Sequence, residues 1–334
     1  MGDVLGFAVI GCGTVSGYGH LPTIAGMTGK AGLRVVADVD PARLASVKGK
    51  YPQAEAYADY RSALARDDVD AVVIATRTDT HVEIAKAALE AGKHVLLEKP
   101  PATTVADARH LLDAARRSGR VIGIDFILRY VEGLRQIKAW CDAGEIGRLR
   151  AIRMINDWWG ADHRGKFPGR GMRLLSHDGS VMVGEGIHHV DLARWITGSD
   201  FGPVQCVGTS IQHPGFPDHQ VLIACMTNGV VLNMECSNAY GFPSKNAAMD
   251  RQLDLIGENG VIKYIETDGR LLLHGKDRTV ELKAPDEKQF SALYDDFIAS
   301  VRAGRPSPTL PTLEDSVKAM ETAVRATELG KRFC

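Results

Sequence analysis

The feature that most restricts the fold of this chain is a regular alternation of short apolar runs and helical stretches over its first 125 residues. The apolar runs are residues 7–10, 33–38, 70–75, 94–97 and 121–124, and the helical stretches between them are residues 41–50, 80–91 and 105–118. Buried strands that alternate with helices at these lengths form βαβ units around a parallel sheet. We therefore expect residues 1–125 to form a doubly wound α/β domain.

The second half of the chain has a different pattern. Its strand candidates are residues 150–155, 220–225, 230–236, 252–256 and 270–273, and its closing helices are residues 288–303 and 312–330. Asn228-Gly229 separates two of these runs and is typical of a hairpin turn, because both residues accept positive φ cheaply. Strands at hairpin spacing predict an α+β domain with a mainly antiparallel sheet over residues 126–334. The pattern leaves open whether its closing helices pack on this domain or back on the first domain.

Composition narrows the class of protein. Lys and Arg total 40 against 41 Asp and Glu, a balance that argues against a nucleic-acid or membrane-surface partner. No apolar run approaches the roughly 20 residues of a membrane span, and the N-terminus lacks the basic region of a secretory signal. The cysteines are scattered without a CxxC pair, so we expect reduced thiols, no zinc ribbon and a cytoplasmic protein. They are Cys12, Cys141, Cys206, Cys225, Cys236 and Cys334.

A glycine-rich turn follows the first apolar run. Gly11 and Gly13 permit a tight turn and a close backbone approach to a pyrophosphate, which then sits at the N-terminus of the next helix. Thr14 and Val15 complete this turn, and Ser16 replaces the third glycine of the usual fingerprint. The alternative is a glycine turn of structural origin alone.

Asp38 ends the second apolar run, at about the distance from the glycines expected of a dinucleotide site. Its carboxylate would accept hydrogen bonds from both ribose hydroxyls of NAD and repel the 2′-phosphate of NADP. Val39 offers no donor to a phosphate, so NAD is favoured. Arg43 is the residue that could oppose this preference for NAD. Either it reaches an adenine or a phosphate, or it is a solvated helix-surface residue.

Glu98-Lys99-Pro100 stands at the carboxyl end of the run 94–97, the edge at which ligands bind to open α/β sheets. A lysine there can hydrogen-bond a substrate hydroxyl and move a proton. The alternative is a solvated lysine on a turn.

These features, with residues 75–81, 88–100 and 186–195, resemble the Gfo/Idh/MocA family of sugar and cyclitol oxidoreductases nearly end to end. The resemblance implies an N-terminal Rossmann domain, a C-terminal domain with an open sheet that often mediates dimers or tetramers, and a nicotinamide cofactor. Lys99 matches the catalytic lysine of the family, and His188 matches its active-site histidine. The positions that match its cofactor side are Thr76, Thr78, His81 and Glu98.

The chain departs from the family at Gly184, where most relatives carry an aspartate four residues before the histidine. Glu185 is the adjacent carboxylate, and it shares a face with His188 if residues 185–196 are helical. A structural cap or core role is the alternative for both. His189 and Asp191 are expected to be structural. No HExxH spacing occurs here, so no metal is expected.

Candidates for substrate contact are weaker. Trp158 and Trp159 follow a strand, and their rings suit the apolar face of a sugar, although core packing explains them equally well. Arg129 and Tyr130 lie near the domain junction, where they close a pocket or hold the domains together. Tyr240 is a further candidate. Specificity is expected in loops such as residues 161–178.

Together these features predict an NAD-dependent oxidoreductase that acts on a secondary alcohol of a sugar, sugar derivative or cyclitol. We expect it to be a homodimer or homotetramer. Lys99 and His188 would be the catalytic residues, and Glu185 would support the histidine. Two alternatives stay open: a redox-neutral glycoside-cleaving enzyme on the same fold, and a non-catalytic NAD-binding sensor.

Overall fold

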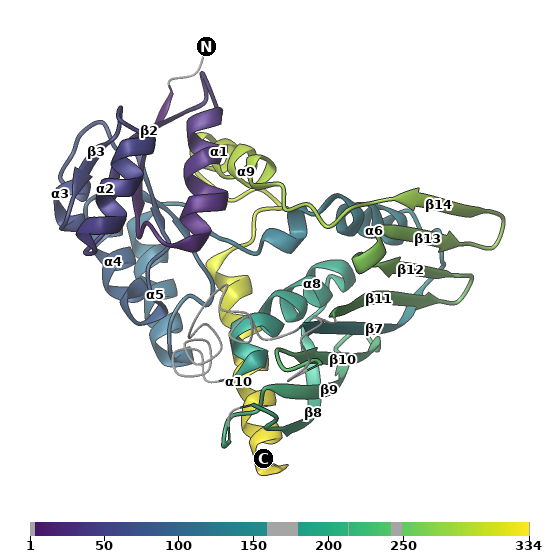
Figure 1. The fold of residues 1–334 in the computed structure, drawn as a ribbon. Coiled ribbons are helices and arrows are strands. Elements are labelled where there is room, and N and C mark those ends of the chain that lie inside the picture. The colour runs from purple at the N-terminus through teal and green to yellow at the C-terminus, as the bar shows by residue number, and fades with distance from the viewer. Residues whose placement is uncertain (1–3, 159–179, 213, 242–248, 334) are drawn as a thin grey trace. The chain divides into compact units, whose positions relative to one another are not determined.

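The computed structural model describes residues 4–158, 180–212, 214–241 and 249–333 (Figure 1). The chain divides into two compact units. The first contains Met1–Ile127 and Gln289–Val317, and the second contains Leu128–Lys288 and Lys318–Cys334. The sequence pattern placed everything after residue 125 in one domain with its closing helices free to pack back. The contacts group residues 289–317 with the first unit, and the boundary near the C-terminus falls inside the last helix.

The first unit is built on a six-stranded sheet in the order β3-β2-β1-β4-β5-β6, and every neighbouring pair is parallel. This confirms the doubly wound parallel sheet. The short edge strand β3 was not expected. The strands are β1 (Leu5–Ile10), β2 (Ala31–Ala37), β3 (Glu55–Tyr57), β4 (Ala71–Ile74), β5 (His94–Leu97) and β6 (Ile122–Ile124), and the helices are α1 (Leu21–Gly26), α2 (Pro41–Lys50), α3 (Tyr60–Leu64), α4 (Thr78–Glu90), α5 (Val105–Ser118) and α9 (Phe290–Ala303).

The core of the first unit explains why its strands read as continuous apolar runs. Every residue of β4 is buried, as expected for a parallel strand covered on both faces. The helix α9, which comes from the far end of the sequence, completes one of these faces. The ring of Phe7 in β1 lies 5.5 Å from that of Tyr294 and 6.2 Å from that of Phe297, measured between centroids. A C-terminal helix is thus part of the N-terminal core.

The second unit is built on an eight-stranded sheet in the order β14-β13-β12-β11-β7-β10-β9-β8. All neighbouring pairs are antiparallel except β7 with β10, which confirms the mainly antiparallel sheet. β8, β12 and β14 were not expected from the sequence. The elements are α6 (Glu132–Asp142), β7 (Leu149–Trp158), α8 (Ile187–Thr197), β8 (Phe201–Thr209), β9 (His219–Met226), β10 (Val231–Ser237), β11 (Met249–Gly257), β12 (Val261–Ile265), β13 (Arg270–His274), β14 (Thr279–Lys283) and α10 (Leu313–Gly330), whose first residues belong to the first unit.

The two faces of this sheet differ. On one, which we call the inner face, Met154, Leu222 and Met234 are buried, and a side chain at Gly186 beside α8 would contact Met234 at 3.1 Å. On the other, the outer face, Ile223 is 51% exposed and Val231 is 49% exposed. Strand residues alternate between the faces with period two, which accounts for the alternating burial of side chains along β9 and β10.

The turn between β9 and β10 forms the expected hairpin. Gly229 carries the positive φ, +88°, and its N–H donates to the carbonyl of Met226 at 2.9 Å. Asn228 does not adopt positive φ; in the described part of the chain only glycines do. The turn therefore needs only one of its two permissive residues.

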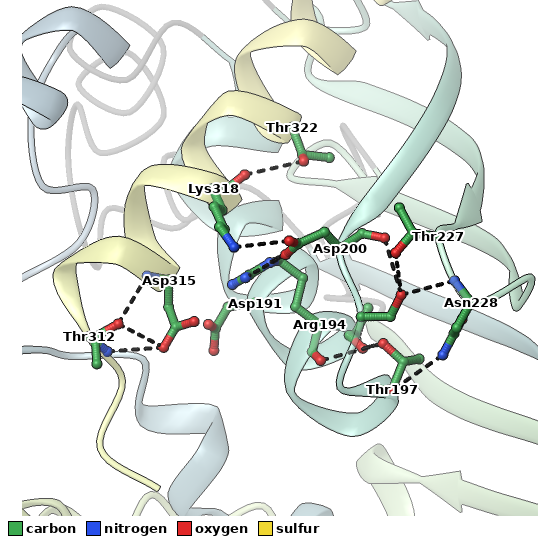
Figure 2. Close-up of polar contacts among 12 residues, drawn as sticks. Asp191, Arg194, Thr197, Asp200, Thr227, Asn228, Thr312, Asp315, Lys318 and Thr322 are labelled. Atoms are coloured by element: carbon green, nitrogen blue, oxygen red, sulfur yellow. Dashed lines mark hydrogen bonds and ion pairs between the residues drawn. The ribbon is translucent and has the colours of Figure 1, made fainter. Parts of the chain in front are cut away.

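The end of α8 is fixed to the start of β8 by an ion-pair network (Figure 2). Asp200 accepts from Arg194 Nη2 at 2.7 Å and from Lys318 Nζ, on α10, at 2.9 Å. Arg194 is 9% exposed, whereas Asp200 is 46% exposed and Lys318 is 41% exposed, so the network lies at the edge of the solvent. Among the described residues, no helix has the length and hydropathy that crossing a bilayer requires, and the five described cysteines are free thiols.

Candidate active site

The glycine turn after β1 has the geometry of a phosphate cradle. Gly11 adopts φ +95°, and a Cβ there would lie 2.5 Å from the carbonyl oxygen of Ala75, so only glycine fits. A Cβ at Gly13 would meet nothing within 4 Å, which leaves this side of the turn open. The helix begins at Thr14, directly after the turn, so its free N–H groups face the space beside Gly13. These residues fit the pyrophosphate of a dinucleotide.

Asp38 is anchored next to this turn. Its Oδ2 accepts from the N–H of Cys12 at 2.6 Å, and its Oδ1 accepts from the N–H of Asp40 at 2.8 Å. Burial, with the nearby negative charge of Asp38, raises the pKa of the Cys12 thiol to about 12, so this cysteine stays a neutral thiol. Val39 is 89% exposed beside the carboxylate, which offers an apolar surface to an adenine ring.

Arg43 is placed on the exposed surface of α2. Its Nε lies 3.3 Å from Asp40 Oδ2, and about half of its side chain is exposed. This placement matches the solvated helix-surface alternative at least as well as a phosphate contact.

A π-helical turn interrupts the first helix and was not foreseen. Residues Ser16–His20 form the π turn before α1, and it places His20 in the core with no exposed surface. Gly19 lies against Phe290 of α9, since a Cβ there would meet the phenyl ring at 2.5 Å. Such turns occur frequently at functional sites.

His20 joins a chain of hydrogen bonds that ends at the backbone of Lys99. Burial lowers the pKa of His20, although Asp125 opposes this, so the neutral imidazole is favoured. Tyr294 keeps its proton because burial raises its pKa well above the usual value. The donors then follow from the partners: Tyr294 Oη donates to His20 Nδ1 at 3.0 Å, and His20 Nε2 donates to Glu98 Oε1 at 3.1 Å. Glu98 Oε2 accepts from the N–H of Lys99 at 3.3 Å.

Asp125 completes this buried cluster. It follows β6, is 3% exposed, and places Oδ2 at 3.6 Å from His20 Nε2. Two carboxylates, Glu98 and Asp125, thus share one imidazole next to a lysine. Sequence reasoning singled out Glu98 and Lys99 but missed His20, Asp125 and Tyr294, which no motif connects.

Lys99 lies directly after β5, at the carboxyl edge of the sheet, and is half-buried. His81 lies beneath this edge and is 1% exposed. Its Nδ1 lies 2.9 Å from the carbonyl oxygen of Pro100 and its Nε2 lies 3.3 Å from that of Thr76. Because burial also lowers its pKa, we expect His81 to be neutral. Its ring connects the loop that carries Thr76 to the loop that carries Lys99. Thr78 begins α4 in the first of these loops.

In the second unit, a π turn at Met182–Gly186 leads directly into α8. From Val181 to Arg194 every residue is buried except Glu185 and His188, which are half-buried. The two predicted active-site residues of this segment are therefore the ones with accessible side chains. The expected continuous helix from 185 is replaced by a π turn followed by an α-helix from Ile187.

The neighbouring polar residues have structural partners. Asp191 is 1% exposed, and its two oxygens accept from Arg129 Nε at 2.8 Å and Nη2 at 2.5 Å. His189 is 8% exposed; burial and the charge of Arg251 lower its pKa to about 4 despite the opposing effect of Glu185. Arg129 is thus held in a buried bidentate pair, and Tyr130 beside it is 4% exposed.

The remaining aromatic candidates are placed as follows. Trp158 ends β7 and is half-buried, and its carbonyl accepts from the N–H of Tyr240 at 3.3 Å. Tyr240 is 36% exposed. Trp159 and the loop 161–178 lie outside the described residues.

Possible metal ligands come together in two groups of the described residues. The first is His20, Glu98 and Asp125, which belongs to the hydrogen-bond chain above, and the second is Asp157, His219 and Glu235 on the other sheet. Neither group contains Glu185, His188, His189 or Asp191.

A parallel sheet in the order found here, with a glycine turn and an anchored aspartate after neighbouring strands, defines a dinucleotide-binding domain. Comparison with known families agrees. Residues 5–126 match the oxidoreductase family with the NAD-binding Rossmann fold, GFO/IDH/MocA, and residues 134–263 match a C-terminal domain of the same family. The chain belongs to the GFO/IDH/MocA oxidoreductase family. The expected family, fold and class of enzyme are confirmed.

Relatives and solved structures extend this result. The chain is 30% identical to an inositol 2-dehydrogenase of Burkholderia multivorans over 98% of this chain and 95% of the relative. It is also 30% identical to inositol 2-dehydrogenase 2 of Saccharopolyspora erythraea, over 77% of this chain and 72% of the relative. A scyllo-inositol dehydrogenase of Lactobacillus casei, solved with NAD(H) and scyllo-inositol, has the same fold with a TM-score of 0.80 at 20% identity, covering 99% of this chain and 98% of that one. The structure of UDP-N-acetylglucosamine 3-dehydrogenase of Acidithiobacillus ferrooxidans has a TM-score of 0.84 at 22% identity, and the match covers 99% of both chains.

Proposed function

We propose that this protein is an NAD-dependent dehydrogenase that oxidises a secondary alcohol of a cyclitol, or of a sugar of similar size. The observation that carries the proposal is the buried chain from Tyr294 through His20 and Glu98 to Lys99, at the edge of a dinucleotide-binding sheet. Inositol 2-dehydrogenases are among its relatives at 30% identity over most of both chains, which supports the cyclitol as substrate.

NAD is the proposed cofactor in preference to NADP. Asp38 is already held by two backbone N–H groups, so its carboxylate is fixed where it would accept from ribose hydroxyls and repel a 2′-phosphate. Arg43 is paired with Asp40, which weakens its competing attraction for a phosphate. Gly11, Gly13, Thr14 and Val15 would hold the pyrophosphate, and Val39 would contact the adenine.

The roles of the side chains follow from their chemistry. When bound, the nicotinamide accepts a hydride from the carbon that carries the alcohol. Lys99 would hydrogen-bond the alcohol and take its proton, while Glu98 fixes the backbone of the lysine. His188 would orient the substrate or exchange the proton, and Glu185 would support the histidine. A positioned acid–base group of this kind contributes about 10²–10⁴-fold to the rate.

Substrate recognition is proposed for the aromatic residues with accessible surface. Tyr240 is 36% exposed. Trp158, whose carbonyl accepts from the N–H of Tyr240, is half-buried. Arg129 and Tyr130 are buried, and the bidentate pair of Arg129 with Asp191 favours their structural alternative.

A homo-oligomer is proposed through the outer face of the eight-stranded sheet. This face exposes four aliphatic side chains, one each on β8, β9, β10 and β11 and each between 44% and 52% exposed: Val207, Ile223, Val231 and Ile256. Exposed apolar residues in such numbers on one sheet are typical of an interface. A cytoplasmic location agrees with the free thiols of the described cysteines.

The test is a panel of inositols, other polyols and sugars, scored for NADH formation, with Lys99→Ala as the matched negative control. We expect NADH from at least one cyclitol with NAD, and formation at least about 10²-fold slower with the variant. Cleavage of a glycoside without net NADH would instead indicate the redox-neutral enzyme. Tight binding of NAD without turnover on any member of the panel would indicate the sensor.

A further inference from the structure

A polar cluster lies on the outer face of the second sheet, at one end of three neighbouring strands. Ser237 of β10 pairs with Asp157 of β7 on one side and with His219 of β9 on the other. Glu235 lies two residues before Ser237 on the same strand, so period two places it on the same face. Ser237, which lies between Asp157 and His219, carries a small side chain.

The three larger side chains converge at the distance that a metal ion requires. Asp157, His219 and Glu235 each offer one ligand atom, and these atoms all lie within 4.8 Å of one another. His219 Nε2 lies 3.4 Å from Glu235 Oε1. Zinc–ligand bonds of about 2.0–2.1 Å in a tetrahedron give ligand–ligand distances of roughly 3.3–3.4 Å, so this pair already spans one edge of such a site.

The electrostatics of the cluster call for a cation. Asp157 is 2% exposed, and its Oδ1 has no hydrogen-bond partner among the described residues. The negative charges of Glu235 and Asp250 both act on this carboxylate. Asp250 lies directly opposite Asp157 on β11.

Basic side chains do not compensate for these acids. Within the described ranges, neither lysine nor arginine pairs with Asp157 or Glu235, and the ion-pair partner of Glu235 is His219. An ordinary ion pair on this face, Arg153 with Asp254, joins β7 and β11 at 3.6 Å. A buried carboxylate with an unsatisfied oxygen and no basic partner is costly unless something else supplies positive charge.

We propose that Asp157, His219 and Glu235 bind a divalent cation with the preferences of zinc. One imidazole and two carboxylates are a donor set that zinc accepts. The ion would join β7, β10 and β9 and leave a fourth position for water. These residues are 16 or more positions apart in the sequence, so spacing could not reveal the site, and the sequence predicted no metal in this protein.

The experiment uses the full chain, stripped with a chelator and titrated with zinc chloride by calorimetry, with manganese and magnesium chloride as comparison. We expect one zinc per chain and a higher melting temperature when it is bound, because the ion binds only the folded state. His219→Gln and Glu235→Gln should each weaken zinc binding by at least about tenfold.

Matched controls separate this site from adventitious binding. His274→Gln removes an exposed histidine from β13, Asp254→Asn removes an acid from the same face, and Cys225→Ser removes an exposed thiol from β9. Each should leave stoichiometry and affinity unchanged. Asp157→Asn keeps the shape of the buried residue and should abolish binding while the chain stays folded by circular dichroism. Absence of zinc binding in the wild type, or zinc binding that survives His219→Gln and Asp157→Asn, overturns the proposal.

Discussion

His20 Nε2 lies 3.1 Å from Glu98 Oε1 although 78 residues separate the two in sequence; the side chain of His20 is fully buried and that of Glu98 is 12% exposed. Through this contact the first helix of the chain supports the residue next to the candidate catalytic lysine. Glu98 in turn accepts from the backbone N–H of Lys99 at 3.3 Å. His20 is therefore a positioning residue, and its importance can be tested separately from that of the lysine.

His20→Leu should lower kcat by about tenfold or more, because small displacements of a catalytic group cost this much or more. Tyr294→Phe removes only the hydroxyl that donates to Nδ1, so its effect on kcat should be smaller. The measurement is steady-state kinetics on the substrate identified by the panel, with NAD binding measured separately. A loss of thermal stability with unchanged kcat in both variants would reduce His20 to a core residue.

Lys99→Ala should reduce kcat by about 10²–10⁴-fold and leave the dissociation constant of NAD nearly unchanged, because we expect the amine to face the substrate. Lys93→Ala is the control, since Lys93 bonds the carbonyl of Arg66 at the other end of the same strand. Near wild-type kcat for Lys99→Ala contradicts the assignment.

Asp38→Ser should reduce the preference for NAD over NADP by about tenfold, equivalent to ~1.4 kcal/mol, because it removes both the ribose acceptor and the repulsion of the 2′-phosphate. The measurement is the ratio of kcat/KM with the two cofactors. Arg43→Ala should leave this ratio unchanged. A wild-type preference for NADP would show that Arg43, or Arg77 directly before α4, outweighs the carboxylate.

Glu185→Gln should lower kcat and move the acidic limb of the pH–rate profile to lower pH, because a carboxylate beside an imidazole favours its protonated form. His188→Ala should cost more. If Glu185→Gln changes the melting temperature but neither kcat nor the pH profile, the carboxylate is structural and Lys99 with His188 must suffice.

His189→Gln should flatten the pH dependence of stability in acid. The pKa of His189 is about 4 in the folded chain against 6.5 ordinarily, so the unfolded state binds more protons between these values and the free energy of unfolding falls as the pH falls. The difference amounts to about 3 kcal/mol. Denaturant unfolding at several pH values measures it. His20 and His81 contribute in the same direction, so the variant should keep part of the slope.

Most of the fold could be predicted because the strands of the first sheet are buried on both faces and form unbroken apolar runs. The strands that were missed lack this signal. β3 has three residues, none fully buried. β8 contains Gly202 and Pro203 and buries only Val204 and Cys206. The pairing of α9 with the first sheet was open for a different reason, since an amphipathic pattern shows that a face is buried but not against which partner.

The residues of the candidate site also differ in whether the sequence could predict them. Gly11, Asp38 and Lys99 could be predicted because each follows a strand whose end is visible in the sequence. His20 could not, because its partners Glu98 and Tyr294 are 78 and 274 residues away. The π turn that turns His20 inward also has no sequence signature of the kind that a capping residue or a proline gives.

The packing of α9 on β1 has a consequence for biosynthesis. The six strands of the first sheet are complete at Ile124, yet Tyr294 and Phe297, which cover Phe7, leave the ribosome only after the whole second sheet. The nascent first unit must therefore carry an uncovered apolar face during translation of about half the gene, a state that attracts chaperones or aggregates. A fragment that stops at residue 127 would keep this defect permanently, so a circular permutant that places 289–317 before residue 4 is the shorter route to an independently folding cofactor domain.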